Sequence, residues 1–104
     1  MIVKQFKTKV MKIQSYGKTY NTETGIFLGE YKTVFYNDIT HKSRIERLYK
    51  VYQRRKKDGY FLHKTTYKYD SSGECFYSFE SMFPVSEDYL KKYCPLKIIS
   101  PQGQ

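Results

Sequence analysis

The sequence has few of the residues that build metal centres and disulfide scaffolds. Its 104 residues include two cysteines, Cys75 and Cys94, two histidines, His41 and His63, and no tryptophan. Two cysteines cannot make a disulfide scaffold, and their spacing to the histidines matches no zinc finger. We therefore expect no structural zinc and no cofactor. We also expect both thiols to be buried or inert, because neither has a base nearby in the sequence or a second cysteine at redox spacing.

Long apolar runs are absent as well, and acidic residues are scarce. No stretch approaches the roughly 18 apolar residues of a membrane span, and lysines interrupt the N-terminus where a signal peptide would be continuously apolar. Ten acidic residues stand against 19 lysines and arginines, which gives a net charge of +9. These features predict a soluble, cytoplasmic protein with a negatively charged partner and no membrane contact.

The positive charge is concentrated in two segments of the chain. Residues 1–18 carry a net +5, and residues 42–68 carry +8, with ten bases against two acids. The segments 19–41 and 69–104 each carry a net −2. A net charge of +8 within 27 residues brings mutual repulsion between the cations, which an ordinary protein surface reduces with interspersed acidic residues. The central segment therefore favours a polyanionic partner.

Aromatic residues must fill much of the core, because only 39% of the chain is hydrophobic while it holds twelve tyrosines and seven phenylalanines. There is no repeat, low-complexity tract or linker, so residues 1–104 form one small domain. We expect the α+β class: a twisted, mostly antiparallel sheet of about four to six strands with a short C-terminal helix. Residues 96–104 are expected to be a loose tail.

Alternating apolar residues and turn residues outline most of the strands. The near period of two over residues 4–20 predicts an exposed or edge strand, with a turn at Gly17. Residues 26–36 predict one or two strands with a bend at Gly29, closed by a turn at 37–38. Residues 60–69 and 75–83 predict a hairpin across the turn 70–73, with Cys75, Tyr77 and Phe79 facing one way and Pro84 ending the strand.

A short helix follows the last predicted strand. Ser86 is a suitable N-cap, the acidic Glu87 and Asp88 stand in the first turn, and Lys91 and Lys92 stand in the last. We expect the helix to run through residue 93 and to stop before the proline at position 95.

The segment from residue 43 to residue 57 fits two structures. As a helix it has Ser43 and Glu46 as a capping box and a stop at 58–59. As a strand it places Ile45, Tyr49 and Val51 on one side and Leu48 and Tyr52 on the other, before turning into a second strand at residue 60. The local pattern alone favours the helix.

The octapeptide Gly-Lys-Thr-Tyr-Asn-Thr-Glu-Thr at 17–24, followed by Gly-Glu-Tyr at 29–31, resembles a family of short, mostly uncharacterised proteins of Firmicutes, their phages and mobile elements. Leu-Tyr at 48–49, Lys-Lys-Asp-Gly at 56–59, Tyr-Phe-Leu at 60–62 and Pro-Val-Ser-Glu at 84–87 fit the same outline, which covers residues 11–93. Two departures are Lys-Thr-Thr at 64–66, where the family has a turn of small residues, and the early helix stop at 94–95.

The resemblance implies strand, turn and strand over residues 44–69, because the family's corresponding segment is too short for a helix between strands. It also implies that residues 1–10 are an N-terminal extension and that Met11 is an alternative start. It implies no catalytic residue. Genes of this kind on mobile elements are associated with counter-defence, including anti-CRISPR inhibition.

The candidate binding site is the basic turn and its surroundings. Such a cluster tracks a phosphate backbone, and tyrosines beside cations form stacking platforms for unpaired bases. The other interpretations are a solvated turn that only keeps the domain soluble, and tyrosines that only pack the core. The proposed nucleic-acid-binding residues are Arg44, Arg47, Lys50, Arg54, Arg55, Lys56, Lys57, Tyr60 and Lys64, and the interleaved tyrosines are Tyr49, Tyr52, Tyr60, Tyr67 and Tyr69.

Three functions remain open on the sequence. The leading one is a non-enzymatic binder of nucleic acid or of a nucleic-acid-guided nuclease complex. The second is a small basic ribonuclease, which requires His63, a cation such as Arg54 or Lys64, and a tyrosine to converge in one concave site. The third is a protein-binding module that uses an exposed strand edge. Glu23 lacks the second carboxylate of a metal-assisted site, so residues 22–24 are expected to form a turn.

Overall fold

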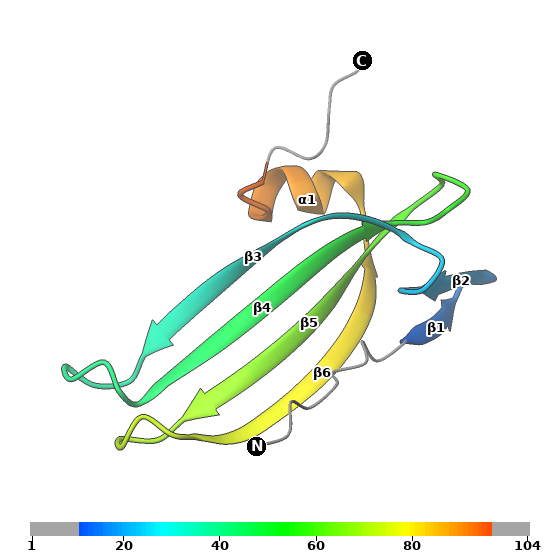
Figure 1. Ribbon diagram of the computed structural model, residues 1–104. Helices are drawn as coiled ribbons and strands as arrows, with labels where there is room; N and C mark the ends of the chain where they lie inside the picture. The colour runs from blue at the N-terminus through cyan, green and yellow to red at the C-terminus, as the bar shows by residue number, and fades with distance from the viewer. Residues whose placement is uncertain (1–10, 97–104) are drawn as a thin grey trace.

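The protein folds into a four-stranded antiparallel sheet with one helix packed on it (Figure 1). The structure is a computed structural model and describes residues 11–96. The predicted α+β class is therefore confirmed. The extension at 1–10 and the tail beyond residue 96 lie outside the described residues. The elements in chain order are β1 (Lys12–Ser15), β2 (Lys18–Asn21), β3 (Ile26–Tyr36), β4 (Arg44–Gln53), β5 (Tyr60–Tyr69), β6 (Cys75–Val85) and α1 (Glu87–Tyr93).

The large sheet is a meander in which β3, β4, β5 and β6 pair in sequence order. The strand, turn and strand over residues 44–69 are confirmed, and the helix that the local pattern favoured is wrong. Residues 45, 49 and 51 share one face of this strand and residues 48 and 52 the other, as predicted. The segment pairs with β3 on one side and with β5 on the other. Pairing with two neighbours overrides the helical capping box.

The N-terminal alternating pattern folds back on itself. Within the described residues it gives two short strands, β1 and β2, that pair antiparallel around Tyr16 and Gly17, both at positive φ. The predicted turn at Gly17 is confirmed. One strand, β3, spans residues 26–36, and its bend at Gly29 is a register shift against β4, with φ of 151° at the glycine.

The last strand differs from its prediction at both ends. β6 continues through Pro84, which pairs with Phe61, and ends at Val85. Proline is tolerated there because β6 is an edge strand of the sheet. At the other end a register shift pairs Cys75 with Tyr69 and Tyr77 with Lys68, so Cys75 does not share a face with Tyr77 and Phe79 as predicted.

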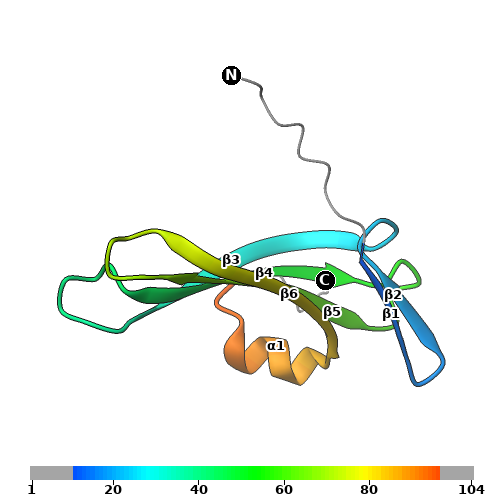
Figure 2. The same cartoon turned by 90° about the horizontal axis from the view of Figure 1, so that it is seen from below.

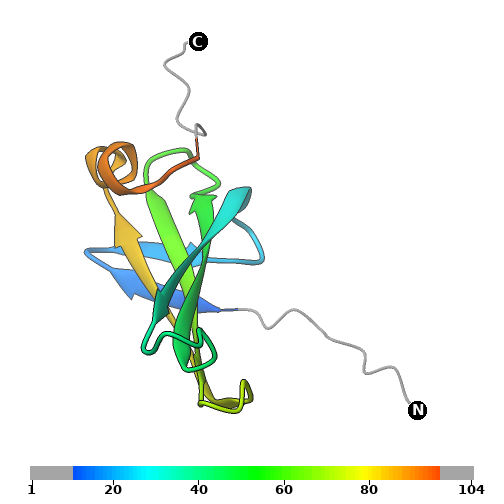
Figure 3. The same ribbon diagram turned by 90° about the vertical axis from the view of Figure 1, so that its left-hand side faces the viewer.

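Two small cores lie on opposite faces of the sheet. Leu90 of α1 packs with Val51 and Leu62, whereas their sequence neighbours Tyr52 and Phe61 pack with Tyr20 of the β1–β2 hairpin. Consecutive strand residues point to opposite faces. The helix and the hairpin therefore cover different faces, which we call the helix face and the hairpin face. Figures 2 and 3 show α1 and the β1–β2 hairpin at separate places on the sheet, with the hairpin crossing one end of the strands.

The helix α1 has the predicted caps and bounds. The Ser86 side chain accepts a hydrogen bond from the main-chain N–H of Tyr89 at 3.0 Å, and the helix ends at residue 93 with Cys94 as C-cap. Leu90 anchors the helix, because its side chain is 1% exposed. No helix among residues 11–96 is long and apolar enough to cross a membrane.

Only part of the helix face is covered. The row of residues beneath α1 runs through Val51, Leu62 and Phe83, and the strands continue beyond it toward the β3–β4 and β5–β6 turns. Figure 2 shows this part of the sheet extending past α1. Beyond it the helix face has three further rows, centred on Lys64, Thr66 and Lys68. Tyr31 and Tyr49 in the first of these rows still pack on the core beneath α1, and Thr66 is 2% exposed.

Candidate nucleic-acid interface

The residues predicted to bind nucleic acid do not lie on one surface. Strand alternation separates them, since neighbouring residues of a strand point to opposite faces. Arg47 and Lys64 lie on the helix face, and Arg44 and Lys50 lie on the hairpin face. The remaining residues belong to the β4–β5 turn or to the first residue of β5: Arg54, Arg55, Lys56, Lys57 and Tyr60.

Arg54 is engaged within the protein rather than presented to solvent. Its Nε donates to the main-chain carbonyl of Thr19 at 3.0 Å, its Nη1 pairs with Asp58, and the guanidinium lies 5.5 Å from the ring centre of Tyr20. Desolvation alone would raise the pKa of Asp58, but the hydrogen bond and charge of Arg54, with Lys18, lower that pKa below its ordinary value. Arg54 is thus a bridge between the turn and the hairpin.

The other three cations of the turn are exposed. Arg55, Lys56 and Lys57 form no ion pair within residues 11–96, and Lys57 has a positive φ of 61°. They keep the turn positive after Asp58 has compensated Arg54. Of the four turn cations expected to contact a phosphate backbone, Arg54 is engaged within the fold, and the other three are exposed.

Arg44 is neutralised on the hairpin face. Its Nε donates to Glu46 at 2.6 Å and its guanidinium lies 3.8 Å from the ring centre of Tyr69. The Arg44 hydrogen bond, helped by the charge of Lys32, lowers the pKa of Glu46 below its ordinary value. Lys50 lies opposite Glu30 of the neighbouring strand on the same face. The hairpin face therefore carries balanced charge.

On the helix face the strands carry cations without carboxylates. All three carboxylates of the four long strands, Glu30, Glu46 and Glu80, lie on the hairpin face. Arg47, Lys64 and Lys68 lie on the helix face, and none forms an ion pair within residues 11–96. The alternation of the strands thus separates a net-positive face from a balanced one.

Exposed rings stand beside these cations. Tyr77 is 50% exposed and Phe79 is 41% exposed, and their ring centres lie 5.5 Å apart. The Lys68 ammonium lies 5.3 Å from the Tyr77 ring centre, and Phe35, 60% exposed, lies on the same face at the end of β3. We call the set Phe35, Arg47, Lys64, Lys68, Tyr77 and Phe79 the open sheet surface.

Sequence reasoning missed four of the six residues of this surface. It named Arg47 and Lys64 but not Lys68, Phe35, Tyr77 or Phe79 as binding residues. The alternation of Tyr77 and Phe79 was recognised, and the strand over 60–69 was too. The missing signal was the register, because it is the pairing of Lys68 with Tyr77 and of Thr66 with Phe79 that brings these residues together.

The tyrosines expected to interleave with the turn cations are packed. Tyr52 is 7% exposed, Tyr60 packs on the core beneath α1, and Arg44 covers Tyr69. Tyr49 stacks on Tyr31, with ring centres 4.7 Å apart. Burial raises the pKa of Tyr31 to about 12, and raises that of Tyr67 as well. The packing interpretation is the right one for these rings.

The groups that a ribonuclease site would need are not brought together. His63 is 7% exposed on the hairpin face, with its Nε2 2.8 Å from Oε1 of Glu80. Lys64 points to the opposite face, and Arg54 is held by Thr19. The convergence that the ribonuclease interpretation requires is therefore absent from the part of the chain that the structure describes.

The remaining candidates fall in ordinary positions. Residues 22–24 form the predicted turn, in which Oδ1 of Asn21 accepts a hydrogen bond from the Glu23 N–H at 2.7 Å. Cys94 is buried as expected, whereas Cys75 is exposed. Comparisons with protein families, with curated proteins and with solved structures find no match for this chain.

Proposed function

We propose that this protein binds single-stranded nucleic acid without cleaving it, and that the open sheet surface makes the contact. The observation that carries the proposal is the separation of charge: Arg47, Lys64 and Lys68 stand without ion pairs among residues 11–96, on a face from which all strand carboxylates are excluded. An anionic backbone lying on this face meets no repulsion from a strand carboxylate.

The rings on the surface favour unpaired bases over a duplex. Tyr77 and Phe79 are exposed side by side, and a base stacks on an aromatic ring only when it is free of its own duplex stack. Cations next to the rings hold the phosphates on either side, which is how sequence-independent single-strand binders combine stacking with charge. An open sheet surface with exposed rings is suited to extended single strands of RNA or DNA.

The turn cations contribute at longer range. Arg55, Lys56 and Lys57 lie beyond the part of the sheet that α1 covers, away from the open sheet surface. Their field adds to the overall net charge of +9 and accelerates the encounter with a polyanion, an effect that salt screens over about 10 Å at 0.1 M.

The resemblance to proteins of mobile elements extends this proposal to a biological setting. A small basic protein of that kind, acting in the cytoplasm, engages the nucleic acid of a guided nuclease complex and keeps it from its target. The anti-CRISPR type of inhibition is the specific form that we propose. Binding of the free nucleic acid is the property to test first, because inhibition of a complex presupposes it here.

Fluorescence anisotropy with a labelled 20-nucleotide RNA tests the surface directly. The variant Lys64→Gln/Lys68→Gln removes two charges from the open sheet surface, and the control Lys32→Gln/Lys50→Gln removes two from the hairpin face. The slope of log affinity against log salt should fall by about 1.4 for the first variant, since each single-strand phosphate contact contributes about 0.7. The control should leave the slope within about 0.3 of the parent.

A second pair of variants tests stacking. Tyr77→Ala/Phe79→Ala should weaken RNA binding by about tenfold or more, because stacking on one ring contributes about 1–3 kcal/mol. Tyr36→Ala, which removes a 47% exposed ring from the hairpin face, should change it less than twofold. Equal losses from both faces would refute the proposal, and a denaturing gel of the same samples would reveal cleaved RNA if the ribonuclease interpretation were correct.

A further inference from the structure

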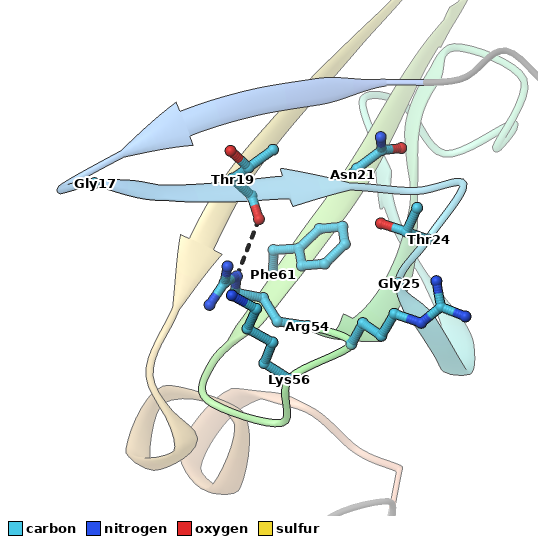
Figure 4. A pocket seen from close by; sticks show the side chains of 9 residues that line it. Gly17, Thr19, Asn21, Thr24, Gly25, Arg54, Lys56 and Phe61 are labelled. Carbon is cyan, nitrogen blue, oxygen red and sulfur yellow. Dashed lines mark hydrogen bonds between the residues drawn. The ribbon is translucent and has the colours of Figure 1, made fainter.

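A cavity of about 430 Å³ lies between the β1–β2 hairpin and the β4–β5 turn (Figure 4). Its polar and charged lining residues are Thr19, Asn21, Thr24, Arg54, Arg55 and Lys56. No carboxylate lines it. We propose that this cavity is a second binding site, one that takes a phosphate group of a small phosphorylated ligand or of a nucleic-acid end.

The walls of the cavity are fixed in place before any ligand enters. Nε of Arg54 donates to the carbonyl of Thr19 at 3.0 Å, and Nζ of Lys18 donates to the carbonyl of Asp58 at 2.7 Å. Each bond joins the hairpin to the turn across more than thirty residues of sequence. A site formed in advance loses little conformational freedom when its ligand binds.

The charge available to a ligand comes from two of the three cations. Asp58 compensates Arg54, but Arg55 and Lys56 are exposed and form no ion pair within residues 11–96. Figure 4 shows Lys56 rising from the turn toward β2, on the side where Arg54 reaches Thr19. Two uncompensated cations at the mouth of a cavity suit a dianion, and charge-assisted hydrogen bonds to phosphate are among the stronger polar contacts.

One neutral donor completes the lining. The hydroxyl of Thr24 points toward Phe61 in Figure 4 and takes part in no hydrogen bond among the described residues. The side chains of Thr19 and Asn21 lie on the other side of β2 from Arg54 and Lys56 in that view. Cations and a free hydroxyl, with no carboxylate in the lining, favour an anionic ligand over a cation.

The cavity and the open sheet surface are separate sites. Phe61 at the floor of the cavity belongs to the hairpin-face core, so the cavity lies on the other side of the sheet from Lys64 and Lys68. Its volume falls within the range of small-molecule sites and exceeds that of a phosphate alone, so it admits a group attached to the phosphate. The phosphate site therefore stands whether or not the sheet surface binds nucleic acid.

A titration of the whole chain with inorganic phosphate, followed by amide chemical shifts at constant ionic strength, tests the site. We expect saturable shifts concentrated at residues 19–25 and 54–56. Arg55→Gln/Lys56→Gln should weaken phosphate binding by about tenfold or more, because it removes two charge-assisted contacts. Lys57→Gln is the matched control, since it removes a cation of the same turn that does not line the cavity, and it should change the affinity less than twofold.

Titrations with a mononucleotide and with oligonucleotides that carry either a 5′-phosphate or a 5′-hydroxyl then distinguish the source of the phosphate. A nucleic-acid end is the ligand if the 5′-phosphate adds shifts at the cavity that the hydroxyl form lacks and binds there more tightly than the mononucleotide does. A free phosphorylated small molecule is the ligand if the mononucleotide binds at the cavity at least as tightly as the 5′-phosphorylated oligonucleotide. Shifts that fail to saturate, or equal losses in the double variant and in Lys57→Gln, would show only diffuse charge screening and overturn the proposal.

Discussion

Arg44 and Glu46, two residues apart on β4, point to the same face of the sheet and share a hydrogen bond of 2.6 Å between Nε and Oε2. The Glu46 side chain is only 14% exposed, and it also lies 3.6 Å from the ammonium of Lys32 on β3. A carboxylate held by two cations at a partly buried position is stabilised in its charged form. This arrangement ties the central strand to the edge strand on the hairpin face.

The pH dependence of stability should reveal this carboxylate. Because the pKa of Glu46 is lower in the folded protein, its stabilising effect is present above the ordinary glutamate pKa of about 4.3 and is lost as the pH falls through the lower folded value. Glu46→Gln should therefore cost about 1–2 kcal/mol at pH 7. In urea unfolding, the difference from the parent should shrink steadily as the pH is lowered below the ordinary glutamate pKa, and a difference independent of pH across the acid range would contradict the assignment.

The two adjacent arginines of the β4–β5 turn should behave differently. Arg54→Ala removes the bridge to Thr19 and leaves Asp58 without its closest partner, so we expect a loss of about 1–2 kcal/mol in unfolding free energy. Arg55→Ala removes an exposed side chain with no ion pair among residues 11–96 and should stay within about 0.5 kcal/mol of the parent. Equal effects in thermal unfolding would show that the bridge carries no stability.

Gly25 should be intolerant of a side chain for a steric reason. A Cβ at this position would lie 2.8 Å from Cζ of Phe61 and 3.0 Å from the carbonyl of Asn21, closer than such contacts are made. Gly25→Ala should destabilise the protein by about 1–3 kcal/mol, because the fully buried ring of Phe61 has little room to move. Gly59→Ala is the control: its nearest contact would be an ordinary 3.5 Å, and its melting temperature should match or slightly exceed the parent's.

Removal of the Thr66 hydroxyl should stabilise the protein. The residue is 2% exposed on the helix face, and its Oγ1 has no hydrogen-bond partner among the described residues. A buried hydroxyl without a partner costs about 1–3 kcal/mol, so Thr66→Val should raise the unfolding free energy by about 1 kcal/mol. Thr65→Val, on the partly exposed hairpin face, should change it by less than half as much. A lower stability for Thr66→Val would mean that the hydroxyl is satisfied.

Turn residues and strand alternation were enough to predict most of the fold. The turns at Gly17 and at residues 70–73, the strand with a bend at Gly29, and the helix capped by Ser86 all follow from local chemistry, because their geometry is fixed by neighbours in the chain. The capping box at Ser43 and Glu46 misled the local analysis, since the same Glu46 is held by Arg44 and Lys32 in a strand.

The candidate sites could be predicted only in part. The sequence by itself determined that this chain is strongly basic and that its cations concentrate between residues 42 and 68. Only the tertiary structure decided which cations remain available. Pairing across strands neutralised Arg44, the hairpin folding over the sheet captured Arg54, and the register of β5 and β6 brought Lys68 beside Tyr77. Those outcomes depend on contacts between residues far apart in the chain, which no local pattern encodes.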